Sequence, residues 1–235
     1  MKKGVYEIFK LLNISYKEKM FSYLLVLIVA YLLGSISFSV IFSKKMAGFD
    51  VREKGSGNAG STNMLRSVGK KAALYTLICD VLKGVVAVLF AIIVGKIAKN
   101  VDRELLVQIA GIAVVIGHTF PIFFGFKGGK GVATSLGVLL ITNWQIGLIC
   151  LVFALALMAV TRMVSLGSCG AAVLFPVLIL FTNNHYTVLT AGKTGRVYLV
   201  YSIILALIVL YNHRTNIKRL LNGTENKLSF KDTND

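Results

Sequence analysis

Long apolar stretches separated by short polar connectors dominate this chain of 235 residues. The stretches cover residues 21–43, 72–95, 105–124, 132–161, 164–182 and 197–212. A helix that crosses a bilayer needs about 20 apolar residues, and the fourth stretch is clearly longer than that. Polar residues at Thr142–Gln145 divide it into 132–142 and 146–161, with Trp144 placed to anchor the break at a membrane interface. The pattern predicts an all-α, polytopic membrane helix bundle of about seven transmembrane helices, the fourth too short to span unless it packs inside the bundle.

Composition agrees with a membrane protein. Hydrophobic residues make up 56% of the chain, above the soluble average, and 22 glycines allow close approach of membrane helices. The three cysteines lie in apolar segments without paired spacing, so we expect neither a disulfide nor a metal site. The first apolar run is too long for a signal peptide and predicts a retained span. We expect a basic N-terminal extension over 1–20, a single transmembrane domain over 21–212 and a tail over 213–235.

The net charge of +16 raises the question of nucleic acid, but the cations flank the apolar segments. There they set membrane topology and meet anionic headgroups or substrates, so we expect no nucleic-acid partner. Of the 26 Lys and Arg residues, 15 fall in the connectors after the first, third and fifth predicted helices or in the tail. The positive-inside rule then places the N-terminus outside and the C-terminus inside. Five lysines among the first twenty residues oppose this orientation, and an interfacial helix there would account for them.

The first of three polar clusters runs from Gly55 to Arg66. Small residues let backbone N–H groups approach a ligand, and the cluster adds hydroxyl and amide donors and a forked cation. The small residues are Gly55, Gly57, Gly60 and Ser61; the donors are Ser56, Asn58, Thr62 and Asn63. This combination suits a phosphate. The alternative is a flexible polar connector.

The second cluster, residues 125–131, places glycines around Lys130 at the predicted start of a helix. Free N–H groups at a helix N-terminus together with a lysine form an anion site. The sequence is not a Walker A loop, because Phe124 and Gly131 stand where that motif needs glycine and Ser or Thr. A basic interfacial loop that serves only topology is the alternative.

The third cluster follows the last predicted helix. His213 and Asn216 are three residues apart and share a helix face, and Arg214 faces headgroups or the site. Glu225, an acid in a basic tail, is placed to orient one of these cations.

Further polar residues lie within the predicted helices. Asp80 and Lys83 face the same way, and a structural ion pair and a catalytic pair fit this spacing equally well. Ser168 points a hydroxyl toward the same end as the three clusters, with Ser165 as its rival. His118 is expected to serve as a structural hydrogen bonder.

Together these clusters resemble the bacterial integral-membrane acyl-phosphate:glycerol-3-phosphate acyltransferases. The matching residues are Gly34-Ser35-Ile36, Gly55–Asn58 with Thr62, Asn63 and Arg66, Asp80 with Lys83 and Gly84, Gly117-His118 with Pro121, Phe126–Thr134, and His213, Arg214, Asn216 and Ile217 with Arg219, Gly223 and Glu225. They span residues 31 to 227 in family order. Ser37, Ala59 and Ser61 depart from the usual family residues without removing a charged or donor side chain.

The resemblance implies residue roles. Catalytic positions would be Ser56, Arg66, Lys130, Ser168, His213 and Asn216; substrate-binding positions would be Gly55, Gly57, Asn58, Thr62, Asn63, Lys127, Gly128, Gly129, Gly131 and Arg214; supporting positions would be Asp80, Lys83 and Glu225. Acyl phosphate and glycerol-3-phosphate would be the substrates, and lysophosphatidic acid and phosphate the products. The enzyme would sit among the lipids of the bacterial cytoplasmic membrane with its active site facing the cytoplasm.

An acyl phosphate has a good leaving group, so the resemblance calls for no cofactor and no metal. The H-x-x-x-x-D signature of other glycerolipid acyltransferases is missing, because Phe123 and Lys218 stand five residues after the two candidate histidines. A transporter or flippase for a phosphorylated solute is the competing class, although it favours polar residues near the midplane and internal repeats. The sequence leaves the oligomeric state open.

Overall fold

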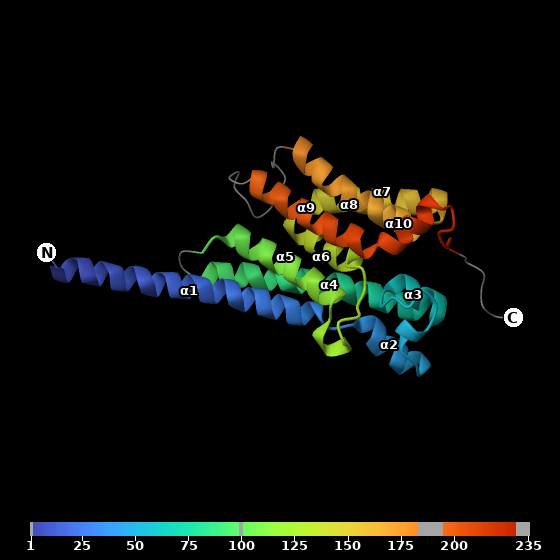
Figure 1. The fold of residues 1–235 in the computed structure, drawn as a ribbon, viewed down its shortest axis with the longest axis horizontal. Helices are drawn as coiled ribbons and strands as arrows, with labels where there is room; N and C mark the ends of the chain where they lie inside the picture. Colours follow the sequence, from blue (N-terminus) through green and yellow to red (C-terminus); the bar gives the residue numbers. More distant parts are fainter. Residues whose placement is uncertain (1, 99–100, 183–194, 229–235) are drawn as a thin grey trace.

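The computed structural model describes residues 2–98, 101–182 and 195–228, and within these ranges it is entirely helical (Figure 1). The α-helices are α1 (Lys2–Gly34), α2 (Phe38–Ala47), α3 (Ser61–Ser67), α4 (Lys70–Ile97), α5 (Arg103–Thr119), α6 (Val132–Thr142), α7 (Trp144–Thr161), α8 (Val164–Phe181), α9 (Gly195–Asn212) and α10 (Arg214–Leu221). Two 3-10 helices, η1 (Val51–Glu53) and η2 (Ile122–Phe124), lie in the connectors.

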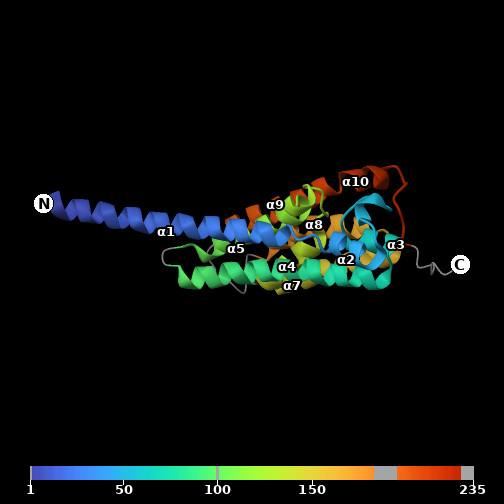
Figure 2. The ribbon, with the colours of Figure 1, turned by 90° about the horizontal axis from the view of Figure 1, so that it is seen from below.

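The long helices run side by side as a bundle. α1 packs against α4 and α5, α6 packs against α4, and α7, α8 and α9 follow one another on the other side. The N-terminal part of α1 projects beyond the other helices, whereas α2, α3 and α10 lie at the opposite end (Figures 1 and 2). All three polar clusters of the sequence lie toward that opposite end.

Helix lengths support a protein that crosses the membrane several times. In the described part of the chain, five segments are long and apolar enough to span, or six if α9 and α10, bent by 67°, form one span. α6 is apolar but has only 11 residues, and it packs against α4, α5 and α7. The predicted membrane helix bundle is confirmed; among the described residues five or six segments are long enough to span, and α6, the short fourth helix of the prediction, is an additional apolar helix.

Glycines bring the helix backbones into contact. A Cβ at Gly34 or Gly117 would collide with the backbone of the facing helix, which joins α1 to α5, and Gly84 and Gly137 do the same between α4 and α6. Without a hydrophobic force between helices in lipid, such close packing stabilises the bundle.

The first predicted span, 21–43, lies within one segment long enough to cross the membrane, Tyr16–Ala47, but two helices form this segment instead of one. The chain breaks at Ser35–Ser37, between α1 and α2. The break is held by a neighbouring helix, since Lys83 Nζ donates to the carbonyls of Gly34 (3.0 Å) and Ile36 (2.9 Å). These carbonyls lie at a helix C-terminus, where a cation stabilises unpaired acceptors.

Two other predicted boundaries meet the structure differently. α1 begins at Lys2 and continues through residue 20 without a break, so the predicted extension is helical and continuous with the first span. The predicted tail includes α10, and its residues 229–235 lie outside the described residues.

Candidate active site

The first glycine loop, residues 51–60, is shaped from inside by Asn63. Asn63 is buried in α3, and its Nδ2 donates to the carbonyls of Val51 (2.8 Å) and Lys54 (3.0 Å). Its Oδ1 accepts from the Ser56 N–H at 2.9 Å. A Cβ at Gly55, where φ is +59°, would collide with the same amide. Asn63, predicted to bind substrate, thus fixes the loop that carries Ser56.

The predicted ligand-binding side chains of this loop face outward. Ser56 and Arg66 are exposed, and Asn58 and Thr62 are partly exposed. Arg66 has no hydrogen-bond partner within the described residues, so its guanidinium remains available to an anion. Its positive charge contributes to lowering the pKa of Lys130, so the two cations lie at the same end of the bundle.

The second glycine loop, residues 125–131, folds back on the end of α5. The N–H groups of Gly128 and Gly129 donate to the carbonyls of Thr119 and His118, each at 3.0 Å. A Cβ at Gly129 would strike the His118 ring, so only glycine fits there. Gly131 has φ +87°, a left-handed conformation that glycine adopts without strain. The loop therefore delivers Lys130 to the start of α6, as the sequence predicted.

Lys130 and the third cluster meet directly. The Lys130 ammonium donates to Asn216 Oδ1 in α10, and the Asn216 amide donates to Glu225 Oε1 at 2.8 Å. Glu225 also accepts from Ser165 Oγ and from Arg219 Nε, each at 2.9 Å. Burial opposes the charge on Glu225, but hydrogen bonds from Asn216, Arg219 and Ser165 outweigh it and lower the pKa of the carboxyl. Glu225 is thus a buried anion that orients Asn216 toward the lysine.

Burial dominates the electrostatics of Lys130. It lowers the pKa of the ammonium to about 8, against the opposing charge of Glu225, while Arg219 and Arg66 add to the lowering. Because burial makes the charged ammonium less favourable, an anion that binds beside it stabilises the charge.

His213 lies at the junction of α9 and α10 and is 3% exposed. Its Nδ1 contacts the Val209 carbonyl at 2.8 Å. The preceding residue, Asn212, reaches the Lys130 carbonyl at 3.4 Å and Thr119 Oγ1 at 3.1 Å. The histidine thus sits beside the second glycine loop, whereas Arg214 turns away to stack on Tyr211.

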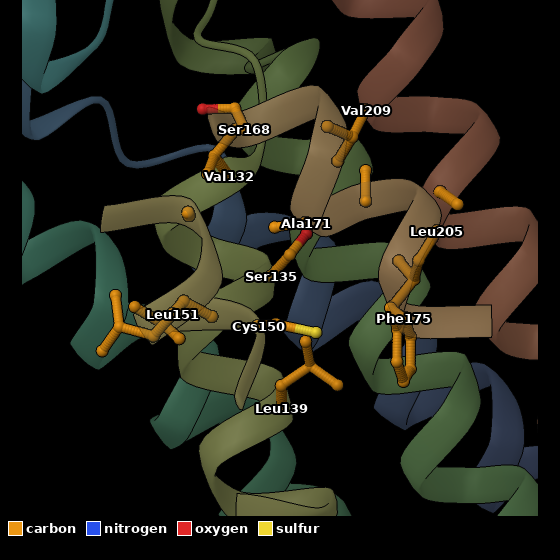
Figure 3. A pocket seen from close by; sticks show the side chains of 14 residues that line it. Val132, Ser135, Leu139, Cys150, Leu151, Ser168, Ala171, Phe175, Leu205 and Val209 are labelled. Carbon is orange, nitrogen blue, oxygen red and sulfur yellow. The ribbon is translucent and has the colours of Figure 1, made fainter. Parts of the chain in front are cut away.

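An apolar cavity opens between α6, α7, α8 and α9 (Figure 3). Its lining consists of Val132, Ser135, Leu136, Leu139, Cys150, Leu151, Ala154, Ser168, Ala171, Ala172, Phe175, Leu205, Ala206 and Val209. Val132 and Ser168 lie toward one end, and Leu139 and Phe175 lie about 10 Å further along their helices. Because Val132 follows Lys130 by two residues, the polar site adjoins this cavity.

The two candidate serines differ in their position relative to the cavity. Ser168 lines it, with Oγ donating to the Val164 carbonyl at 2.9 Å. Ser165 instead binds Glu225. Of the two, Ser168 is the one next to a space that could hold substrate.

Asp80 and Lys83 form a buried cluster with His118, whose ring lies against Gly129 of the second glycine loop. Their side chains pair at 2.9 Å, and His118 Nδ1 lies 3.5 Å from the same Asp80 oxygen. With Lys83 bound to the α1–α2 break, these residues have a structural arrangement, which is one of the two roles that the sequence left open.

Sequence analysis missed Arg52 and Asp50. Arg52 donates to both carboxylate oxygens of Asp50, at 2.9 and 2.8 Å, and its Nη1 reaches the carbonyls of Phe124 (2.6 Å) and Lys127 (3.1 Å). The signal available was an acid and an arginine two residues apart, just before a glycine-rich loop.

These features define a class: a multi-pass membrane protein with a cationic, glycine-lined site beside an apolar cavity, suited to an anionic head and an acyl chain. Within the described residues, no group of three His, Cys, Asp or Glu side chains is placed to hold a metal ion.

Comparisons with known proteins narrow this class. The sequence model of a family described as glycerol-3-phosphate acyltransferase matches residues 24–223. A glycerol-3-phosphate acyltransferase of Clostridioides difficile (strain 630) is 46% identical over 213 residues, covering 91% of this chain and 98% of that protein. One from Shouchella clausii (strain KSM-K16) is 44% identical over 203 residues, covering 86% and 93%.

Solved structures agree. The glycerol 3-phosphate form of PlsY, an integral membrane glycerol 3-phosphate acyltransferase, aligns with TM-score 0.74 and 34% identity over 88% of this chain and 96% of that one. Its lysophosphatidic acid form aligns with TM-score 0.72 and 33% identity. The chain belongs to the glycerol-3-phosphate acyltransferase family. That membership decides between the acyltransferase and the transporter, the two classes that the sequence left open.

Proposed function

We propose that this enzyme transfers an acyl group from an acyl phosphate to the C1 hydroxyl of glycerol-3-phosphate, giving lysophosphatidic acid and inorganic phosphate. One observation carries the proposal: Lys130 is half-buried at the end of the second glycine loop, two residues before Val132, which lines the apolar cavity. An acyl phosphate has the same division, a dianionic head joined to an apolar tail. The related PlsY structures are described as glycerol 3-phosphate and lysophosphatidic acid forms, which supports the same acceptor and product here.

The proposed reaction is a direct displacement. The C1 hydroxyl oxygen attacks the acyl carbonyl carbon, the bond between that carbon and the phosphate oxygen breaks, and the hydroxyl proton passes to a departing phosphate oxygen. The protein then needs to align two anions and stabilise developing negative charge. Lys130 and Arg66 provide charge, and Ser56, His213 and Asn216 provide further polar contacts to the two phosphates.

Other residues would support these contacts. Backbone N–H groups of the glycine loops that are not already hydrogen-bonded within the protein would bind phosphate oxygens, with Asn58, Thr62 and Lys127 around them. Arg214 would have to leave its stacking contact with Tyr211 to join them. Asn63 and Glu225 would act by holding their neighbours in place, as their hydrogen bonds indicate. Ser168, at the cavity, would contact the acyl donor near its carbonyl.

Single-turnover transfer tests this mechanism. With acyl-labelled acyl phosphate, label is expected to pass to lysophosphatidic acid without a protein-bound stage. Lys130→Ala and Arg66→Ala are expected to lose nearly all transfer, by about 100-fold or more, whereas Ser168→Ala retains part of it. Label trapped covalently on Ser168 or Ser56 would overturn direct displacement.

We further propose that the enzyme lies in the bacterial cytoplasmic membrane with this site facing the cytoplasm. The connectors and tail that build the site hold the majority of the cations, which the positive-inside rule assigns to that side. Cysteine introduced at exposed Lys44 or Lys227 should then react in intact cells only with a membrane-permeant reagent. Labelling of either by an impermeant reagent would reverse the orientation.

A further inference from the structure

The two glycine loops are joined by the side chain of Arg52. This arginine, in η1 of the first loop, donates from Nη1 to the carbonyls of Phe124 (2.6 Å) and Lys127 (3.1 Å), which flank the start of the second loop. Its other N–H groups hold Asp50, whose carboxylate is 8% exposed. We propose that Arg52, oriented by Asp50, is a positioning residue that sets the separation of the two glycine loops for acyl transfer. The proposal rests on the two-phosphate reaction above.

In the first glycine loop, Arg52 is connected to Arg66 through a short chain of contacts. Arg52 follows Val51, whose carbonyl binds Asn63 Nδ2. Asn63 lies one turn before Arg66 in α3, so a shift of η1 moves the helix that carries the guanidinium.

In the second glycine loop, Arg52 is connected to Lys130. The Lys127 carbonyl bound by Arg52 lies three residues before the catalytic candidate, in a loop already tied at Gly128 and Gly129 to the end of α5. The loops also touch closely, because a Cβ at Gly129 would lie 2.8 Å from the Ala59 carbonyl. Arg52 therefore connects the supports of the two cations proposed to hold the two phosphates.

Arginine suits this position for a geometric reason. Its planar fork binds one carboxylate with two N–H groups while a third points in a fixed direction, an arrangement that a lysine ammonium does not reproduce. The hydrogen bond from Arg52 also lowers the pKa of Asp50 against the effect of burial, so the carboxylate stays charged and holds the fork. Lys44, 3.7 Å from Asp50, and the nearby Glu53 are the other charged groups at this pair.

Separation matters because transfer needs both substrates at once. Each loop can bind its own phosphate when the loops shift slightly, but the attacking oxygen and the acyl carbon then lose alignment. A misplacement of about 1 Å costs on the order of 100-fold in rate. Loss of the Arg52 side chain should consequently lower kcat far more than it changes the binding of either substrate.

The test compares wild type with Arg52→Ala, Arg52→Lys and the control Lys54→Ala, an exposed cation two residues along the same loop. The measurements are kcat and KM for both substrates, the number of glycerol-3-phosphate sites per protein, and the thermal midpoint. For Arg52→Ala we expect kcat about 10- to 100-fold lower, KM values within about threefold and unchanged site number. Arg52→Lys should recover only part of the rate, and Lys54→Ala should match wild type.

Added methylguanidine provides a readout that a general loss of folding would not give. It should restore Arg52→Ala turnover saturably and leave wild type unaffected. Asp50→Ala combined with Arg52→Ala should cost little more than Arg52→Ala alone, because the two act as one unit.

Three results would overturn the proposal that Arg52 positions the two glycine loops. They are an Arg52→Ala kcat equal to wild type, a rate loss matched by an equal loss of glycerol-3-phosphate sites, and no rescue by methylguanidine. Failure of wild type to transfer from acyl phosphate would instead refute the proposed reaction, so the two failures are distinguishable.

Discussion

At the scale of single residues, Lys130 combines two opposing demands. In the proposed reaction it must be charged to hold a phosphate, yet burial lowers its pKa to about 8. Asn216 and Glu225 compensate by presenting an amide oxygen and, behind it, a carboxylate. This arrangement keeps a desolvated cation ready for an anion without a neutralising partner in direct contact.

The pH dependence of glycerol-3-phosphate use follows from this residue. Because burial lowers the pKa of Lys130, the charged form dominates below about pH 8 and is lost above it. We expect kcat/KM for glycerol-3-phosphate to fall as pH rises through 8 when acyl phosphate is kept well below its KM, the condition in which this ratio reports the free enzyme. Lys130→Arg keeps its charge throughout this range and should show no such fall. A wild-type profile that stays level to about pH 10, the range of an ordinary lysine, would contradict the account.

Sequence reasoning identified the cations at helix ends and Glu225 as an acid that orients one of them, but not Arg52. Lys130, His213 and Asn216 were visible because of the glycines or the helix spacing around them, and Glu225 because it is an acid that follows several cations in a basic tail. Arg52 was missed: its pairing with Asp50 is local, but the contacts that link the two loops go to backbone carbonyls more than 70 residues away. Carbonyl acceptors are present at every residue, so no side-chain pattern marks such a contact.

At the scale of elements, helix ends set by local chemistry were predictable and those set by tertiary contacts were not. α6 has the predicted bounds 132–142, and Asn143, in the predicted polar interruption, caps α7 by accepting from the Ile146 N–H. The α1–α2 break lies within an apolar run without proline and depends on Lys83 from another helix. α3 and the 67° bend after α9 were also missed, because both are packed against other parts of the fold.

Close packing of α6 on α4 yields a prediction about stability. A Cβ at Gly137 would collide with the Val81 carbonyl, a backbone atom that cannot turn aside. Gly137→Ala should therefore lower the thermal midpoint, since overpacking costs about 1–3 kcal/mol. Gly170→Ala is the matched control, as its Cβ would meet only the side-chain ends of Leu157 and Phe153. Equal midpoints for the two variants would argue against the backbone contact as a determinant of stability.

At the scale of the whole molecule, the fold separates the two halves of the proposed reaction. Glycine loops, α3 and α10 form a polar end, and α6 to α9 enclose an apolar cavity that begins beside Lys130. Hydropathy predicted the bundle, and the charge distribution predicted that the clusters would share one end. The cavity depends on side-chain packing among four helices, which the sequence pattern does not specify.

A larger side chain in the cavity should raise the KM for a long-chain acyl donor without changing the KM for glycerol-3-phosphate. Ala171 lines it on α8, and Ala171→Phe would occupy space proposed for the acyl chain. We expect a KM for a long-chain acyl phosphate at least about tenfold higher, with KM for glycerol-3-phosphate and use of a short-chain acyl phosphate little changed. Val173→Phe, on the same helix but 50% exposed and outside the cavity, should behave as wild type. An equal loss with long- and short-chain donors would place the chain elsewhere.

The most direct test of the account is phosphate release by the purified enzyme from palmitoyl phosphate and glycerol-3-phosphate, with palmitoyl-CoA as the alternative donor. The account predicts one phosphate released per lysophosphatidic acid formed, only when both substrates are present, and no transfer from palmitoyl-CoA. Transfer from palmitoyl-CoA, or none from palmitoyl phosphate by folded protein, would contradict it.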